Sequence, residues 1–231
     1  LGGWLGSIST GWQKWAFYLA AGYEALAIFL GSTRGAMIGL AVGALVFLVY
    51  KTYTTYKTYR TYRNPAAIIL AALIIFSGIF MTTRSAAVWQ SIPGLDRLAS
   101  ISKTEGSINN RLIVWGIAVD SFKQSPIIGS GWENFKYSFD RRYDPKLFRS
   151  GFGETFWDRP HNVFLEYLAN AGLFGLLAYL GVFASAFYVV IKKTSKQFAP
   201  FGVALLVAYA VQNAAVFDSF GTYLMLFALL A

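Results

Sequence analysis

Long apolar runs that carry few charges are the feature that most limits what this chain can fold into. Apolar residues make up 56% of its 231 residues and charged residues only 13%, whereas a soluble domain carries about 25% charged residues. A membrane span requires roughly 17–25 mostly apolar residues. Six windows are candidates, some of them short: Trp15–Leu30, Gly35–Tyr50, Ala66–Met81, Gly172–Ile191, Phe201–Phe217 and Thr222–Ala231.

These windows predict an all-α fold, a polytopic bundle of transmembrane helices within a lipid bilayer. The sequence starts at Leu1 and ends inside an apolar run, so we expect a fragment of a larger membrane protein. It contains no cysteine, so neither a disulfide framework nor a cysteine-based metal site is expected.

Two basic segments predict the orientation of the bundle. Lys51–Arg63, with the sequence KTYTTYKTYRTYR, has no acidic residue, and three lysines lie within residues 192–196. Short basic loops mark the cytoplasmic side of a membrane. If all six windows span, both segments lie in the cytoplasm. The expected division is first transmembrane helices in residues 1–81 with a basic cytoplasmic loop at 51–63, an external (periplasmic) loop at 82–161, and an interfacial helix with the last transmembrane helices at 162–231.

The external loop is expected to contain short amphipathic helices. Arg111–Phe122 places four apolar residues at helical spacing, namely Leu112, Trp115, Val119 and Phe122. Ser125-Pro126 is expected to end this helix, and Gly129-Ser130-Gly131 to form a tight turn. A further short helix is predicted at Asn162–Ala171, because Pro160 favours a helix start just after it.

His161 is the only histidine of the chain, and it lies where the external loop meets this last predicted helix. Histidine is the side chain whose unperturbed pKa lets it exchange a proton near neutral pH. A helix N-terminus disfavours a positive charge, so a neutral imidazole is expected here, as a general base requires. The alternative interpretation is a polar anchor at the membrane interface.

Two arginines on the same predicted side could converge with the histidine. Arg34 lies in a very tight turn between two windows, and ionisable residues beside spans are often functional because they are costly there. The alternative for Arg34 is a snorkelling anchor. Arg111 begins the first loop helix, after Asn109-Asn110.

Four strings of the sequence, in this order, resemble a known family. They are STRG at a span boundary, NNRLIVW, SPIIGSGWENF and RPHNVFLEYLANAGLFG. Together they are similar to the O-antigen ligase and O-antigen polymerase superfamily of bacterial membrane glycosyltransferases, over roughly Gly31–Leu180. In that family a Ser-Arg pair ends one span, whereas Thr33 intervenes here.

The resemblance implies a fold of many transmembrane helices with one large external loop. It implies that Arg34 and Arg111 hold a lipid-linked diphosphate and that His161 is the catalytic base. Arg159, Asn162 and Glu166, in the same motif, are candidate supporting residues.

The implied reaction is metal-independent glycosyl transfer, with inversion if the displacement is direct. The donor is a glycan on a polyprenyl diphosphate, and the acceptor is a lipid core, a protein or a second glycan. The implied place is the outer face of the bacterial cytoplasmic (inner) membrane, in polysaccharide or lipopolysaccharide biosynthesis of the cell envelope. No cofactor, metal or nucleic acid is expected, and the loop acids form no Asp-x-Asp pair.

A transporter for an ion or a lipid-linked glycan is the alternative function. Glu24 lies in the middle of the first window, and buried carboxylates in spans often serve ion pathways. Gln212 and Asn213 would add polar lining. Against this alternative, the polar residues concentrate in the external loop. A further alternative is an inactive scaffold in an assembly complex.

The orientation predicts the labelling of single cysteines, because the chain has none of its own. In intact spheroplasts, an impermeant thiol reagent is expected to label Ser107→Cys and to miss Thr58→Cys until the membrane is opened. Equal labelling at both positions would contradict the predicted orientation.

Overall fold

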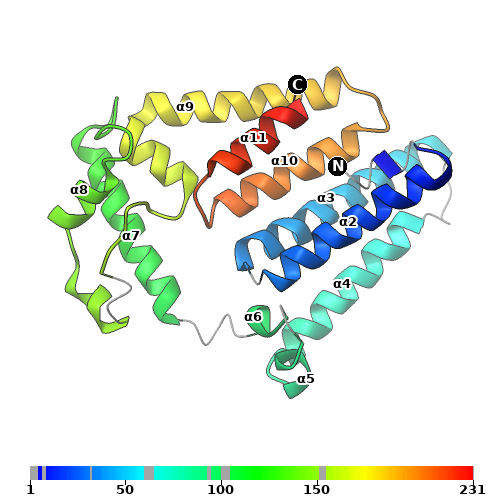
Figure 1. Cartoon of the computed structure of the whole chain (residues 1–231), viewed down its shortest axis with the longest axis horizontal. Helices are drawn as coiled ribbons and strands as arrows, with labels where there is room; N and C mark the ends of the chain where they lie inside the picture. The colour runs from blue at the N-terminus through cyan, green and yellow to red at the C-terminus, as the bar shows by residue number, and fades with distance from the viewer. Residues whose placement is uncertain are drawn as a thin grey trace. The chain divides into compact units, whose positions relative to one another are not determined.

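A computed structural model describes residues 5–6, 9–31, 33–59, 65–92, 95–99, 105–150 and 155–230. The described residues form helices and loops without a β-strand (Figure 1), which confirms the predicted all-α class. The chain divides into two compact units. Unit 1 comprises Leu1–Ser102 and Phe187–Tyr209, and unit 2 comprises Lys103–Ala186 and Ala210–Ala231.

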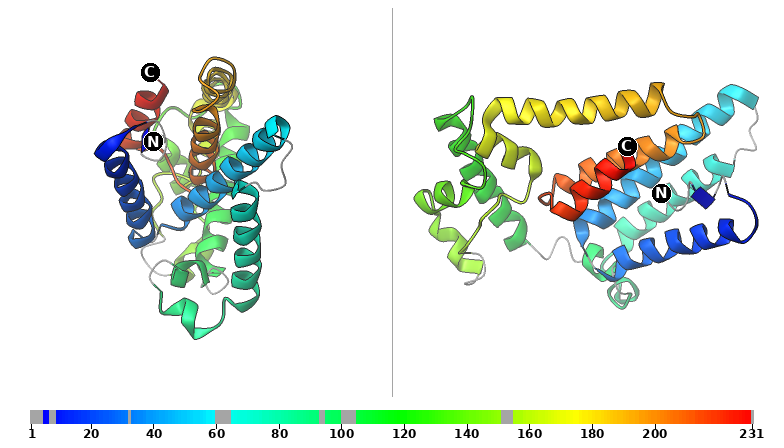
Figure 2. Two further views of the ribbon diagram at one scale, coloured as in Figure 1. Left: turned by 90° about the vertical axis from the view of Figure 1, so that its right-hand side faces the viewer. Right: turned by 45° about the horizontal axis from the view of Figure 1, so that its top comes forward.

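Unit 1 is built on three long helices, followed by two short ones. The long helices α2 (Gly11–Leu30), α3 (Arg34–Tyr59) and α4 (Pro65–Thr83) lie beside one another (Figure 1 and Figure 2). The short helices are α5 (Ala87–Gln90) and α6 (Leu95–Ala99).

Close packing joins α3 to α10 (Ala199–Asn213) within unit 1. A Cβ added at Gly43 would lie 2.8 Å from the Cβ of Ala208 and 2.9 Å from the carbonyl oxygen of Ala204. The ring centroids of Phe47 and Phe201 are 4.6 Å apart. The small residue at position 43 therefore lets the two helices approach closely, as is common between membrane helices.

Three helices of the described residues are long and apolar enough to cross a membrane. They are Arg34–Lys57, Pro65–Thr83 and Val163–Lys192, which contain the second, third and fourth predicted windows. The first window forms α2, whose Lys14 and Glu24 lower its apolar character. The last two windows form shorter helices, α10 and α11 (Phe220–Leu230).

The basic segment 51–63 differs from its prediction as a loop. Residues 51–59 continue α3, and residues 60–64 lie outside the described part of the chain. The helix continues because no glycine or proline interrupts it before Tyr59. Within it, the Thr54 hydroxyl donates to the Tyr50 carbonyl, at 3.0 Å. The cytoplasmic location of this segment stays a prediction.

Unit 2 gathers most of the polar segment around its own apolar core. It contains α7 (Glu105–Gln124), α8 (Phe135–Arg141), the 3₁₀ helix η2 (Pro145–Ser150), most of α9 (Val163–Lys192) and α11. The buried core residues are Val114, Ile117, Ala118, Phe135, Phe139, Leu147, Trp157 and Ala169.

The buried face of α7 is not the stripe that the sequence predicted. Leu112 of that stripe is 54% exposed, whereas Val114, Ile117 and Ala118 are buried. Apolar residues occupy nearly every position from Leu112 to Val119, so helical spacing alone does not select one face. The residues that α8 and η2 cover decide which face is buried.

Helix α9 breaks at Gly172, where the backbone is non-helical with φ 64° and ψ −161°. The break separates residues 163–171 from residues 173–192. It deprives the N–H groups of Leu173 and Phe174 of their helical acceptors, the carbonyls of Ala169 and Asn170. Buried backbone groups of this kind must be paired elsewhere.

The turn at residues 125–131 pairs all four of these groups. The N–H groups of Leu173 and Phe174 donate to the carbonyls of Pro126 and Ile127, at 2.8 and 3.3 Å. In return, the N–H groups of Ser130 and Gly131 donate to the carbonyls of Ala169 and Asn170, at 2.9 Å each. We call this reciprocal set of four hydrogen bonds the Gly172 lock. It joins the turn at residues 125–131 to the helix break.

The Gly172 lock requires glycine on both sides. A Cβ at Gly172 would lie 2.4 Å from the carbonyl oxygen of Ile127, and one at Gly129 would lie 2.3 Å from the carbonyl carbon of Asn170. Both glycines also have positive φ, which residues with a Cβ adopt only at a cost. The strings SPIIGSG and LANAGLFG therefore contact each other through their glycines.

Alanine at either glycine of the lock is expected to destabilise the protein. Gly129→Ala and Gly172→Ala should each cost about 1–3 kcal/mol through backbone strain, in addition to the displacement of the opposing backbone. The measurement is the thermal aggregation midpoint of the protein in detergent. Gly181→Ala in α9 is the control, because its added Cβ meets nothing within 4 Å. Equal midpoints for Gly172→Ala and Gly181→Ala would contradict the lock.

Candidate active site

His161 has a strained backbone, with φ 52° in the left-handed region. Among the described residues, Glu133 is the one other non-glycine residue with positive φ, at 60°. Such conformations cost energy and are concentrated at functional sites. Both residues lie in unit 2, and both contact Arg159, as described below.

Two aromatic rings and one carbonyl hold the His161 ring. Its centroid lies 4.7 Å from that of Trp157 and 5.1 Å from that of Phe217, each edge to face. Its Nδ1 lies 3.2 Å from the carbonyl oxygen of Arg159. The neutral tautomer that donates from Nδ1 to this carbonyl carries its lone pair on Nε2. This arrangement is suited to accepting a proton at Nε2.

Helix α7 fixes the backbone just before the histidine. The indole Nε1 of Trp115 donates to the carbonyl of Pro160, at 2.9 Å. Asn162, just after the histidine, caps the first turn of α9. Its Oδ1 accepts the N–H groups of Phe164 and Leu165, at 3.0 and 3.2 Å. The observed contacts of Asn162 are therefore those of an N-cap.

Arg159 links two acidic side chains. Its Nη2 lies 2.6 Å from Oε1 of Glu133, and its Nη1 lies 3.2 Å from Oε1 of Glu166. The guanidinium also lies over the ring of Phe217, at 5.0 Å from the centroid. The Glu166 side chain is only 4% exposed, so Arg159 provides a partner for a buried carboxyl group. Two of the predicted supporting residues thus form one ion pair.

Arg111 reaches the segment that also contacts His161. Its Nη1 donates to the carbonyl of Ala215, at 2.7 Å, two residues before Phe217. The structure therefore brings Arg111 and His161 to the same segment, residues 214–219 of unit 2. Arg34 is the first residue of α3 in unit 1, and its part in the site stays a prediction.

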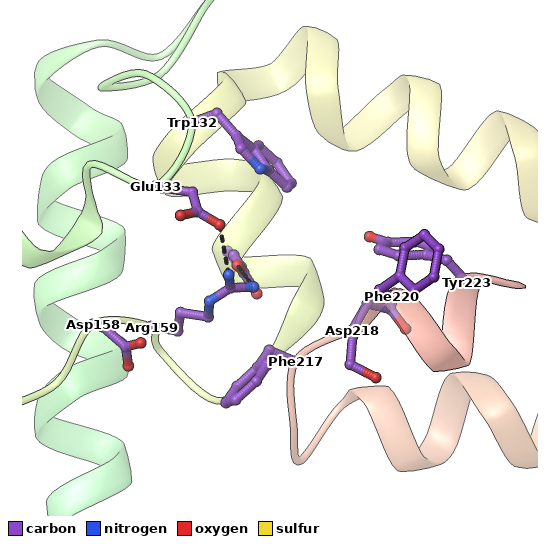
Figure 3. Close-up of a pocket in the computed structure, with 10 residues that line it drawn as sticks. Trp132, Glu133, Asp158, Arg159, Phe217, Asp218, Phe220 and Tyr223 are labelled. Carbon is purple, nitrogen blue, oxygen red and sulfur yellow. Dashed lines mark hydrogen bonds and ion pairs between the residues drawn. The ribbon is translucent and has the colours of Figure 1, made fainter.

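A pocket of about 520 Å³ lies beside these residues. Figure 3 shows Trp132, Glu133 and Arg159 on one side of an open space, with Asp218, Phe220 and Tyr223 across from them. The lining residues are Trp132, Glu133, Asp158, Arg159, Glu166, Phe217, Asp218, Ser219, Phe220 and Tyr223. Among the described residues, no three histidine or acidic side chains are grouped so that they could hold a metal ion.

Asp218 anchors the far side of the pocket. It is 4% exposed, and its carboxylate accepts hydrogen bonds from Asn213 Nδ2 at 2.9 Å, from Thr222 Oγ1 at 3.2 Å and from the Tyr179 hydroxyl at 3.4 Å. A buried carboxylate is tolerated when its oxygens are bonded in this way. The network ties the end of α10 and the start of α11 to α9.

The comparison with protein families decides the family of the chain. The model of the O-antigen ligase family matches residues 17–180, more than two-thirds of the chain. The chain belongs to the O-antigen ligase family. This confirms the resemblance carried by the four strings. No curated protein is significantly similar to the chain.

Membership of the O-antigen ligase family identifies the chain as a membrane glycosyltransferase of the ligase or polymerase type. The family acts in polysaccharide and lipopolysaccharide biosynthesis, on lipid-linked glycans. The match includes Arg34, Arg111 and His161 but ends before Phe217 and Asp218. The pocket of this O-antigen ligase family member is thus completed by residues outside the matched range.

Sequence reasoning missed most of the pocket residues. Nothing in the sequence distinguishes Glu133 and Trp132 from the other acidic and aromatic residues around them. Asp218 had a usable signal, because it is the only acidic residue after Glu166 and lies between two apolar windows. Asn213, a candidate for lining a transport path, instead donates to Asp218 and to the Tyr179 hydroxyl.

Two substitutions at Asn162 can distinguish its role as a helix cap from a role in the reaction. Asn162→Ala should lower the free energy of unfolding by about 0.5–2 kcal/mol, whereas Asn162→Asp should retain most of it, since aspartate also caps helices. Thermal midpoints and transfer rates per folded molecule measure the two effects. A full loss of turnover in Asn162→Asp at normal stability would show a chemical role beyond the cap.

Proposed function

We propose that this protein transfers a glycan from a polyprenyl diphosphate to an acceptor hydroxyl at the outer face of the cytoplasmic membrane. The observation that carries the proposal is the strained, ring-clamped His161, whose Nδ1 lies against the Arg159 carbonyl. Strain of this kind persists only where surrounding structure imposes it, and here it presents an imidazole beside a pocket.

In the proposed mechanism, Nε2 of His161 takes the proton of the acceptor hydroxyl as its oxygen attacks the anomeric carbon. The bond between that carbon and the phosphate oxygen breaks, and its electron pair leaves with the diphosphate. A direct displacement of this kind inverts the anomeric centre. A positioned general base typically contributes roughly 10²–10⁴-fold in rate.

The leaving diphosphate gains negative charge, so cations nearby would stabilise the transition state. Guanidinium groups are suited to this task because they pair with phosphate oxygens in a planar, bidentate way. We assign this role to Arg111, which the Ala215 carbonyl holds against the segment, residues 214–219, that His161 also contacts. We assign it to Arg34 on the basis of the family motif. Arg159 is a weaker candidate, because two carboxylates already pair with it.

The acceptor distinguishes a ligase from a polymerase. A lipid core or a protein would make the enzyme a ligase, and a second carrier-linked glycan would make it a polymerase. The family membership supports both types, and it favours a glycosyltransferase over the transporter alternative.

His161→Gln tests the mechanism most directly, because glutamine keeps polarity and approximate size but does not act as a base. Transfer from a purified polyprenyl-diphosphate glycan should fall roughly 10²–10⁴-fold, while binding of the donor stays near the wild-type level. Rates are measured per molecule of membrane-inserted full-length protein. Near-normal turnover would remove His161 from the mechanism.

If the two arginines bind the diphosphate, their planar guanidinium groups should be required, and a positive charge alone should not suffice. Arg34→Lys and Arg111→Lys should each lower transfer about ten- to a hundredfold, as expected for a lost charge-assisted contact of roughly 1.5–3 kcal/mol. Arg141→Lys, at an exposed position of α8, is the matched control and should keep full activity. Full activity in Arg34→Lys or Arg111→Lys would mark that residue as an anchor.

A further inference from the structure

The pocket combines open aromatic rings with hydrogen-bond acceptors. Trp132 is 49% exposed and Phe220 is 83% exposed, and both line the pocket with Tyr223 and Phe217. The Trp132 ring is held by an edge-to-face contact with Tyr167, with centroids 5.0 Å apart. Rings so large and open to a pocket offer flat apolar faces to a ligand.

Carboxyl groups dominate the polar lining. Glu133, Asp158, Glu166 and Asp218 line the pocket, against the single guanidinium of Arg159. That guanidinium is already paired with two of the four acids. Ionised carboxylates only accept hydrogen bonds. The exposed acids Glu133 and Asp158 therefore make the lining rich in acceptors, and among the described residues it is poor in cations.

We propose that this pocket is the subsite for an uncharged sugar ring of a glycan substrate, and that it disfavours sugars bearing phosphate or carboxylate groups. The proposal rests on the glycosyl transfer proposed above and names the class of sugar that this transfer uses. A sugar ring presents an apolar C–H face, which suits Trp132 and Phe220, and hydroxyl donors, which suit the carboxylates. The volume of about 520 Å³ lies within the usual range of ligand pockets, roughly 300–1,000 Å³.

The same lining argues against the diphosphate as the occupant. A phosphate placed here would meet like charges from Glu133 and Asp158, which repel it at close range. Its attraction to Arg159 is reduced by the acids already bound there. The diphosphate and the sugar ring are therefore expected at different places.

Phe217 connects the pocket to the proposed base. Its ring lines the pocket and contacts His161, with centroids 5.1 Å apart. A sugar ring in the pocket would contact Phe217, whose ring in turn contacts the residue that would take a hydroxyl proton. A subsite for a reacting glycan must lie close to the base in this way.

The test is saturation-transfer NMR on the full chain in nanodiscs. The neutral probes are methyl glucoside and methyl N-acetylglucosaminide, and the charged probes are methyl glucuronide and glucose 6-phosphate. Neutral probes are expected to bind at least several-fold more tightly than charged ones. Trp132→Ala and Phe220→Ala should each weaken neutral binding about two- to tenfold. Phe227→Ala, exposed on the same helix as Phe220 but outside the pocket, is the control and should not.

Asp158→Asn tests the charge selectivity separately. Asp158 is exposed in the pocket lining, and asparagine removes its charge while keeping a carbonyl acceptor. Asp158→Asn should therefore strengthen binding of the charged probes about two- to tenfold relative to binding of the neutral probes. Equal binding of neutral and charged probes by the wild type, or unchanged binding in both aromatic variants, would overturn the proposal.

The transfer assay shows whether the sugar in the pocket belongs to the donor or to the acceptor. It also distinguishes a failure of the subsite proposal from a failure of the proposed function. Phe220→Ala should raise the KM of the donor if the pocket holds the donor glycan, and that of the acceptor if it holds the acceptor. Neutral sugar binding without any transfer by the wild type would contradict the proposed function and leave the sugar subsite standing. Transfer with both KM values unchanged in Trp132→Ala and Phe220→Ala would overturn the subsite and leave the function standing.

Discussion

Where α9 leaves the helical conformation at Gly172, four backbone groups lose their partners, and the turn at residues 125–131 binds all four. The exchange is reciprocal, because each segment donates two hydrogen bonds and accepts two. It also leaves no room for a side chain at Gly129 or Gly172. The path of the chain from the polar segment into the apolar part of α9 depends on this contact.

The site follows from that contact. The short helix at residues 163–171 begins at the Asn162 cap and ends at the break, so the Gly172 lock and the cap fix it from both ends. His161 stands directly before the cap, and Glu133 lies two residues after the locked turn. Arg159 joins the two sides through Glu133 and Glu166. The backbone hydrogen bonds of the Gly172 lock thus help to position His161, the ion pairs of Arg159 and the pocket beside them.

The sequence predicted the parts of this arrangement that local patterns encode. Apolar windows identified three helices long enough to span, and the glycine and proline pattern placed the turn after α7. It did not predict which face of α7 is buried, since apolar residues surround that helix. It also missed the contact of Asp218 with Tyr179, because residues 39 positions apart meet only through tertiary packing. The predicted loop at residues 51–63 is wrong for residues 51–59, which continue α3 because no helix-breaking residue occurs there.

Hydrogen exchange of the protein in nanodiscs tests the Gly172 lock most directly. The four donors are the amides of Ser130, Gly131, Leu173 and Phe174, and mass spectrometry can follow them in two peptides, around residues 126–131 and 169–176. The account predicts slow exchange in both peptides, and faster exchange in both after Gly129→Ala, because the bonds break together. Fast exchange of the 126–131 peptide in the wild type, at the rate of an exposed loop, would contradict it.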